Sequence, residues 1–278
     1  MASKEILHSV QRNVKVLKSS LAENWRIRRH LALAYRILDR LNLNEGACNH
    51  LSAICPASSG QEEVILVIPG ILPDGSALHW SKVTASSLLG INSNQDIIEP
   101  GSLGGIPEES AACIHTGFRR IQPDSKVIFH THTDYATALG CVEPCQFPMI
   151  HQNGVRFYDR FAFHTSYGLP TIQDEAESLG VSMGDKNVLF MSNHGTLISS
   201  PTVHLAFDEI YYLEQASKNV IISRNAAATS GDKLKEIPQD TLVEAAKYYN
   251  KEMLDFYAKR HFYAYWNLYL HEQPDVFL

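Results

Sequence analysis

The 278-residue sequence has no apolar stretch near the roughly eighteen residues that a membrane-spanning helix needs. It has no basic surplus either, because 24 Lys and Arg stand against 30 Asp and Glu, whereas nucleic-acid-binding proteins concentrate basic side chains on one face. It begins with MASKEILHSV, which lacks the apolar core of a secretory signal. Its five cysteines are odd in number and include no Cys-x-x-Cys pair. We therefore expect a cytoplasmic, reduced protein with no membrane and no nucleic-acid partner.

The composition is that of an ordinary globular protein, with 45% hydrophobic and 19% charged residues. There is no internal repeat or low-complexity tract, and the length is near the upper size of one domain. We expect residues 1–278 to form a single domain. Within it, residues 1–24 would be an N-terminal helical extension and residues 238–278 a C-terminal helix with an aromatic tail.

The N-terminal segment, residues 3–43, repeats apolar residues at spacings of three and four, which predicts helix, with a possible break near Glu23. Its one basic cluster, RIRRH at 26–30, is interpreted as a solvated helix face. The stretch AAATSGDKLKE at 226–236 is the most linker-like part of the sequence and is expected to connect two helices.

Helical and strand-like segments alternate along the rest of the chain. Strands are expected in NLNEGACNHLSAICP, EEVILVIPG, DIIEPG and SKVIFHTH, near 147–151 and 161–164, and at 187–192. Helices are expected in PEESAACIHTGFRRI and at 133–141, 173–182, 202–218 and 238–262, with a short helix or turn in SKVTASSLLGI. This alternation predicts an α/β protein with helices on both faces of a central sheet.

Two histidines one residue apart close the strand-like run VIFHTH. Residues i and i+2 of a strand project from one face, so His130 and His132 can present two imidazoles to one metal ion. A second apolar strand, NVLFMSNHGTLIS, ends near His194, and Gly195 is expected to allow a tight turn there. The alternative is a set of hydrogen-bonded histidines at strand ends.

The sequence resembles the class II aldolase/adducin family. The resemblance is carried by NLNEGACNHLSAI, LHWSKVTASSLL, IHTGFRRIQPDSKVIFHTHTDYATAL, GDKNVLFMSNHGTLIS and PTVHLAFDEIYYLEQAS, and it spans roughly residues 25–220. It implies a three-layer α/β/α domain with a mostly antiparallel central sheet, usually assembled as a homotetramer with active sites between subunits. It places the family's metal ligands on His130, His132 and His194.

Three neutral imidazoles leave a divalent ion its charge and an open coordination position. Such an ion acts as a Lewis acid in aldol cleavage and decarboxylation. We expect Zn²⁺ first, with Fe²⁺ or Mn²⁺ as alternatives, and a small-molecule substrate.

The sequence departs from the sugar-phosphate aldolases of this family at two places. Ala111 stands where the resemblance puts their acid–base glutamate, so Glu108 and Glu109 are the substitute candidates. The same segment holds the substrate phosphate in those enzymes, and His50 replaces a phosphate-binding asparagine. Because a carboxylate would repel a phosphate, we expect an unphosphorylated substrate.

Further candidates have weaker support. Asp134 is expected to orient a metal ligand, and Asn193 is a candidate for contact with a ligand or the substrate. In the family the C-terminal region can cover an active site, so Tyr263 and Tyr265 are candidates for delivering a proton, with helix packing as the alternative.

The sequence therefore predicts a metal-dependent carbon–carbon lyase acting on a small hydroxy- or keto-acid. One alternative is a three-histidine iron oxygenase, resembling the enzymes of this fold in aminocoumarin biosynthesis. Another is a non-catalytic module resembling adducin head domains, which have lost the metal histidines.

Overall fold

The computed structural model describes residues 2–167 and 172–278, and an eight-stranded sheet forms its centre. The strands are β1 (His50–Pro56), β2 (Glu63–Val67), β3 (Leu89–Ile91), β4 (Ile97–Glu99), β5 (Val127–Thr131), β6 (Phe161–His164), β7 (Val188–Met191) and β8 (Gly195–Ser200). Their spatial order is β4-β3-β2-β1-β5-β8-β7-β6, and each pair is antiparallel except β6 with β7. The expectation of a mostly antiparallel sheet is confirmed.

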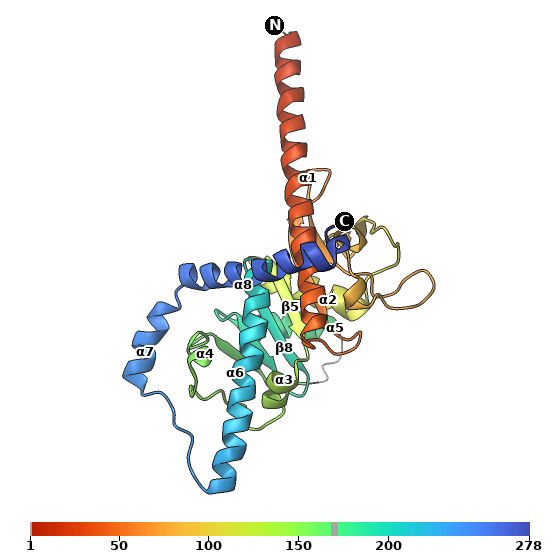
Figure 1. The fold of residues 1–278 in the computed structure, drawn as a ribbon. Helices are drawn as coiled ribbons and strands as arrows, with labels where there is room; N and C mark the ends of the chain where they lie inside the picture. Colours follow the sequence, from red (N-terminus) through yellow and green to blue (C-terminus); the bar gives the residue numbers. More distant parts are fainter. Residues whose placement is uncertain (1, 168–171) are drawn as a thin grey trace.

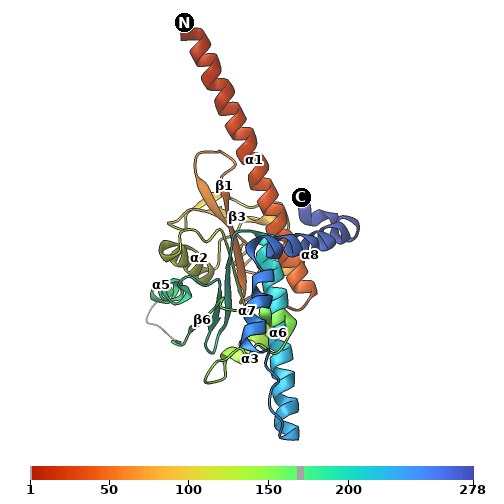
Figure 2. The ribbon, with the colours of Figure 1, turned by 90° about the vertical axis from the view of Figure 1, so that its left-hand side faces the viewer.

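Helices cover both faces of this sheet. They are α1 (Ala2–Arg40), α2 (Glu109–Ile121), α3 (Asp134–Gly140), α4 (Gln152–Val155), α5 (Ile172–Met183), α6 (Val203–Ser230), α7 (Gln239–Tyr248) and α8 (Lys251–Glu272). Short 3₁₀ turns lie at Trp80–Lys82, Ala85–Ser87 and Pro274–Phe277. Figure 2 shows α2 and α5 on one side of the sheet and α1, α6 and α8 on the other, which confirms the three-layer α/β/α class.

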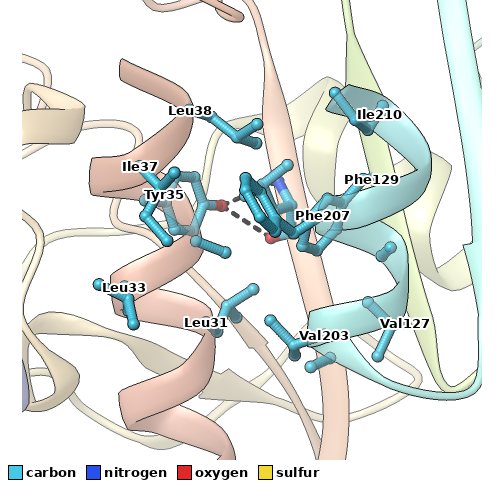
Figure 3. Packing of buried hydrophobic residues seen from close by; sticks show 14 of the residues in the cluster. Leu31, Leu33, Tyr35, Ile37, Leu38, Val127, Phe129, Val203, Phe207 and Ile210 are labelled. Carbon is cyan, nitrogen blue, oxygen red and sulfur yellow. Dashed lines mark hydrogen bonds between the residues drawn. The ribbon is translucent and has the colours of Figure 1, made fainter. Parts of the chain in front are cut away.

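The alternation of side chains along β5 supplies both cores. Val127 and Phe129 pack with residues of α1 and α6 (Figure 3), while Ile128 packs with Phe118 of α2 and Leu179 of α5. Successive strand residues point to opposite faces, so Val127 and Phe129 enter one core and Ile128 enters the core on the other face. The face that carries Ile128 is therefore also the face of His130.

Tyr35 ties α1 to the strand that carries His50. Its hydroxyl donates to the Leu51 carbonyl at 2.7 Å and accepts from the Leu51 N–H at 2.9 Å. The ring is fully buried among α1 and α6 side chains, as Figure 3 shows. A buried hydroxyl needs such partners, and these two bonds hold β1 in register beside α1.

The N-terminal helix differs from expectation in two ways. It runs unbroken past Glu23, and its first turns extend away from the body of the molecule in Figure 1. The basic cluster at 26–30 is solvated only in part, because Arg26 and Arg29 are exposed but Arg28 and His30 are 6% and 4% exposed. Arg28 donates to the Leu88 carbonyl at 2.7 Å and to Glu99 at 2.8 Å. Carbonyl and carboxylate partners offset the cost of burying the guanidinium.

Three other expectations are corrected. No strand forms at 147–151, where the chain is irregular and leads into α4. The helix expected at 202–218 continues to Ser230, so only the second part of 226–236 connects helices. The helix expected at 238–262 is divided because Asn250 accepts from the N–H groups of Glu252 and Met253 and starts a new helix.

No helix in the described ranges combines enough length with enough apolar character to cross a bilayer.

Candidate metal centre

His130 and His132 lie at the end of β5, in the middle of the sheet. His130 is 1% exposed and stands opposite His50 of β1 on one side and Leu197 of β8 on the other. His132 follows the last residue of the strand and is partly exposed. The strand therefore delivers one imidazole inside the molecule and one at its surface, both toward the same region.

The Nδ1 atoms of both imidazoles face groups that can only accept hydrogen bonds. His130 Nδ1 lies 3.1 Å from the Thr196 carbonyl oxygen, and His132 Nδ1 lies 2.7 Å from Glu45 Oε2. Each Nδ1 must therefore carry a proton, and in a neutral ring this leaves Nε2 unprotonated. The two Nε2 atoms are 3.0 Å apart, so two lone pairs meet at this point.

His194 completes the group from a different pair of strands. It lies in the turn between β7 and β8, where Asn193 adopts a left-handed conformation with φ of 58°. The His194 ring centroid is 4.8 Å from that of His130 and 4.9 Å from that of His132. One ligand nitrogen from each of the three lies within 4.8 Å of the others. The structure thus brings together the three histidines that the sequence singles out.

Gly195 is needed for space and not for the turn that the sequence suggests. The left-handed residue is Asn193, whereas Gly195 begins β8. A Cβ atom at Gly195 would lie 2.6 Å from His132 Cδ2 and 2.7 Å from the Thr131 carbonyl oxygen. Contacts this short force the neighbours to move, so the glycine allows β8 to pass directly beside the imidazole.

Burial favours the neutral form of His130 and His194. It lowers the pKa of His194 to about 4 and the pKa of His130 well below its usual range, and the neighbouring histidines lower both pKa values further. Neutral imidazole is the form that binds a metal ion. Three converging imidazole nitrogens fit a divalent cation such as Zn²⁺.

A hydrogen-bonded chain of buried side chains lies behind His130. Arg119 Nη2 donates to Ser52 Oγ at 3.0 Å, and Ser52 Oγ lies 2.8 Å from His115 Nδ1. His115 Nε2 lies 2.9 Å from His50 Nδ1, and the His50 ring centroid is 4.8 Å from that of His130. Burial lowers the pKa of His50 to about 4. The polar interior of the site therefore extends from β5 through β1 to α2.

Glu108 caps the N-terminus of α2 with its own carboxylate. The carboxylate accepts from the Ser110 N–H at 3.0 Å and the Ala111 N–H at 2.8 Å, and Ser110 Oγ also donates to it. Burial raises the pKa of Glu108, but these hydrogen bonds outweigh it and the pKa is lowered. Glu109 is the exposed first residue of the helix. Of the two candidate acids, Glu108 is the one near His50, and it is held as a cap.

The weaker candidates lie in different places. Asp134 is exposed in the first turn of α3, and the carboxylate that receives His132 Nδ1 belongs to Glu45. The Tyr263 hydroxyl lies 3.3 Å from His30 Nε2, and the Tyr265 ring packs against Phe207. Both tyrosines are on α8, on the opposite side of the sheet from α2. Within the single chain they contribute to packing.

Sequence reasoning missed the partners of the histidines. Glu45 stands in the turn before β1, and nothing local marks it as a partner for a residue 87 positions away. The Thr196 carbonyl is backbone, which carries no sequence signal. The motif NHLS at 49–52 did contain a signal, because alternation along β1 places His50 and Ser52 on one face.

Comparison with known proteins agrees with this architecture. The family model described as Class II Aldolase and Adducin N-terminal domain matches residues 29–221. An adducin-related protein from Schizosaccharomyces pombe is 29% identical over 221 residues, and the match covers 77% of this chain and 64% of that protein. The chain therefore spans less than two thirds of the length of that relative.

Two solved structures share the fold. An aldolase II superfamily protein from Pseudomonas syringae superimposes with a TM-score of 0.78 at 24% identity, covering 92% of this chain and 96% of that chain. L-fuculose 1-phosphate aldolase from Glaciozyma antarctica PI12 gives 0.70 at 18% identity, covering 88% and 90%. The family match extends over more than half of the sequence, and the sheet and helix layers agree with it. This chain belongs to the class II aldolase and adducin N-terminal domain family.

Proposed function

We propose that the protein is a divalent-metal-dependent lyase that breaks or makes a carbon–carbon bond next to a carbonyl group. Its substrate would be a small hydroxy- or keto-acid without a phosphate. His130, His132 and His194 would hold the ion, with Zn²⁺ preferred. When bound, the ion supplies Lewis-acid chemistry, which stabilises negative charge on a substrate oxygen during aldol cleavage or decarboxylation.

The observation that carries this proposal is the pair of facing Nε2 atoms on His130 and His132. In the neutral rings both are acceptors, 3.0 Å apart, because each Nδ1–H donates its hydrogen bond to Thr196 or Glu45. Two lone pairs at this distance repel unless a cation lies with them. A buried group of neutral imidazoles therefore favours a metal ion, and Glu45 orients His132 toward it.

The expectation of an unphosphorylated substrate is supported by Glu108. A helix N-terminus is a ready site for a phosphate because its N–H groups are free. Here the Glu108 carboxylate already accepts from two of these N–H groups. A phosphate at α2 would have to displace this carboxylate and approach its charge. The pKa of Glu108 is lowered, so this carboxylate is better suited to remain charged than to act as a general base near pH 7.

We also propose a cytoplasmic homotetramer in which residues 1–278 act as one domain. Phe256, Tyr257, Tyr263 and Leu270 are exposed large apolar or aromatic side chains on α8. Such side chains are common at subunit interfaces. In this arrangement Tyr263 or Tyr265 would act at a neighbouring subunit's site and not at its own.

A non-catalytic role is the second candidate, and the similarity to an adducin-related protein favours it. Metal analysis of protein purified without added ions separates the candidates. Zinc or manganese with turnover that needs no oxygen supports the lyase. Iron with oxygen consumption identifies an oxygenase, and the absence of metal with no turnover supports the non-catalytic module.

The histidine variant His132→Ala tests the lyase directly. We expect loss of the metal and a fall in kcat/KM of about a thousand-fold or more, because a site with two imidazoles binds a divalent ion weakly. The matched control is His271→Ala, which removes an exposed histidine at the end of α8. Full activity of His132→Ala would refute the mechanism.

A further inference from the structure

A small pocket lies beside His50, at the start of β1. Its lining includes Asn49, His50, Gly70, Glu108 and Ala111, and its volume is about 20 Å³. About 10–15 Å³ of such space holds one water molecule. The pocket therefore accepts a single oxygen-sized group. His50 connects it to the histidine site, because its ring centroid is 4.8 Å from that of His130.

Asn49 brings an unused donor to this pocket. The residue is 2% exposed, and its Oδ1 accepts from the Glu45 N–H at 2.7 Å. This bond fixes which end of the amide is oxygen, because an N–H must meet an acceptor. Asn49 Nδ2 is buried and has no hydrogen-bond partner among the described residues. A buried donor without a partner is costly, so a ligand oxygen would satisfy it.

His50 supplies a second donor because of the direction of the hydrogen-bonded chain behind it. Arg119 can only donate, so Ser52 Oγ accepts from it, and the one hydroxyl proton of Ser52 is left for His115 Nδ1. His115 must then carry its proton on Nε2 and donate to His50 Nδ1. The remaining proton of His50 is on Nε2, which has no protein partner in the described part of the chain.

The reverse order of donors and acceptors along this hydrogen-bonded chain is disfavoured at both ends of the chain. It would leave the buried Ser52 hydroxyl proton without an acceptor among the described residues. It would also leave a lone pair in place of a donor on Nε2 of His50, which lines the pocket together with Glu108 and interacts with its charge. The Glu108 charge acts favourably only on the N–H form.

We propose that Asn49 Nδ2 and His50 Nε2–H form a two-donor pocket for one carbonyl or carboxylate oxygen of the substrate. The Arg119–Ser52–His115 chain positions His50 as a donor. The substrate part of this inference rests on the proposed lyase function, whereas the proton arrangement does not. The pocket discriminates against phosphate by size, because its volume admits one oxygen and a phosphate group would bring several together.

The proton arrangement is tested on the full-length metal-free protein by nitrogen NMR of ¹⁵N-labelled imidazoles, with His50→Gln used for assignment. We expect His50 and His115 to be protonated on Nε2. In Ser52→Ala, which removes the proton that directs the chain, both rings should become tautomer mixtures, whereas Ser93→Ala on the surface should change nothing. Protonation of wild-type His50 on Nδ1 would overturn the proposal.

The oxygen-binding role is tested with zinc-loaded protein by calorimetric titration with oxalate and, separately, inorganic phosphate. We expect oxalate to bind at least about ten-fold more tightly than phosphate, and Asn49→Asp to weaken oxalate binding about ten-fold or more, because a donor becomes a charged acceptor. Asn49→Leu, which adds no charge, should weaken it less. The control is Asn94→Asp, an exposed position in a turn.

Thermal unfolding first shows whether the Asn49 variants are folded, and the binding results of folded variants can then be interpreted. Unchanged oxalate affinity in both variants, or tighter binding of phosphate than of oxalate, would overturn the pocket. Failure of wild-type protein to take up zinc would contradict the proposed function instead. The tautomers of the metal-free protein would still decide the donor chain, so the two failures can be told apart.

Discussion

Two groups of buried and partly buried histidines lie on opposite faces of the sheet. One is the candidate metal centre, His130, His132 and His194. The other, here called the α8 histidines, consists of His30, His204 and His261, between α1, α6 and α8. Burial lowers the pKa of His194 and of His30 to about 4. A lowered pKa is therefore common to both groups and does not mark the functional one.

The groups differ in where their nitrogens point. His204 Nε2 lies 2.8 Å from Asp255, and His261 Nδ1 lies 2.7 Å from Asp208. His30 lies among aromatic rings and meets the Tyr263 hydroxyl. Each α8 histidine thus has its own partner. In the candidate metal centre the Thr196 carbonyl and Glu45 hold the outer nitrogens of His130 and His132, and one ligand nitrogen from each of the three histidines converges on a common point.

The largest expected effect is a loss of stability at the α8 histidines. Asp208→Asn removes the charge that faces Arg156 and His261, and Asp208 is fully buried. We expect a loss of about 3–5 kcal/mol in the free energy of unfolding, since a buried guanidinium is left without its partner. Urea denaturation measures it, and zinc content should not change. Asp255→Asn, at a more exposed pair, is the control and should cost less than about 1 kcal/mol.

A smaller effect is expected from Gly195→Ala. The added methyl group meets His132 and the Thr131 carbonyl, so we expect a stability loss of about 1–3 kcal/mol together with weaker zinc binding. Calorimetry and zinc titration measure the two effects. Gly154→Ala adds a methyl whose nearest contact is an ordinary 3.4 Å to Phe147. If both variants bind zinc equally, the close approach of β8 to His132 is irrelevant to the site.

The smallest expected effect tests whether the hydrogen bond to an outer nitrogen, His132 Nδ1, contributes to zinc affinity. Glu45→Gln keeps an acceptor for His132 Nδ1 but removes the charge, and the Glu45 side chain is 65% exposed. We expect zinc affinity to fall about ten-fold, the lower end for groups that orient a metal ligand. Competition with a chelator measures it. Asp134→Asn should leave the affinity unchanged, and an equal effect of both variants would argue against a specific Glu45 contact.

The sequence predicted the parts of the site that depend on local periodicity. Alternation along VIFHTH places His130 and His132 together, and the apolar run before His194 predicts the strand that leads to it. The position of Glu108 at the start of α2 also follows a local rule, because acidic residues favour a helix N-terminus. Local patterns failed where packing decided, as with the buried Arg28 in a basic cluster.

By itself, the sequence determined the α/β class, most helices and the three histidines, because helix and strand periods are written into neighbouring residues. Only the tertiary structure decided which groups hold each imidazole. Glu45 meets His132, Arg119 meets Ser52 and Thr196 meets His130 across long separations in the chain. The antiparallel pairing of β5 with β1 and β8 brings Glu45 and Thr196 to the histidines, and α2 brings Arg119 to Ser52 of β1. A hydrogen bond depends on distance in space and not on position along the chain.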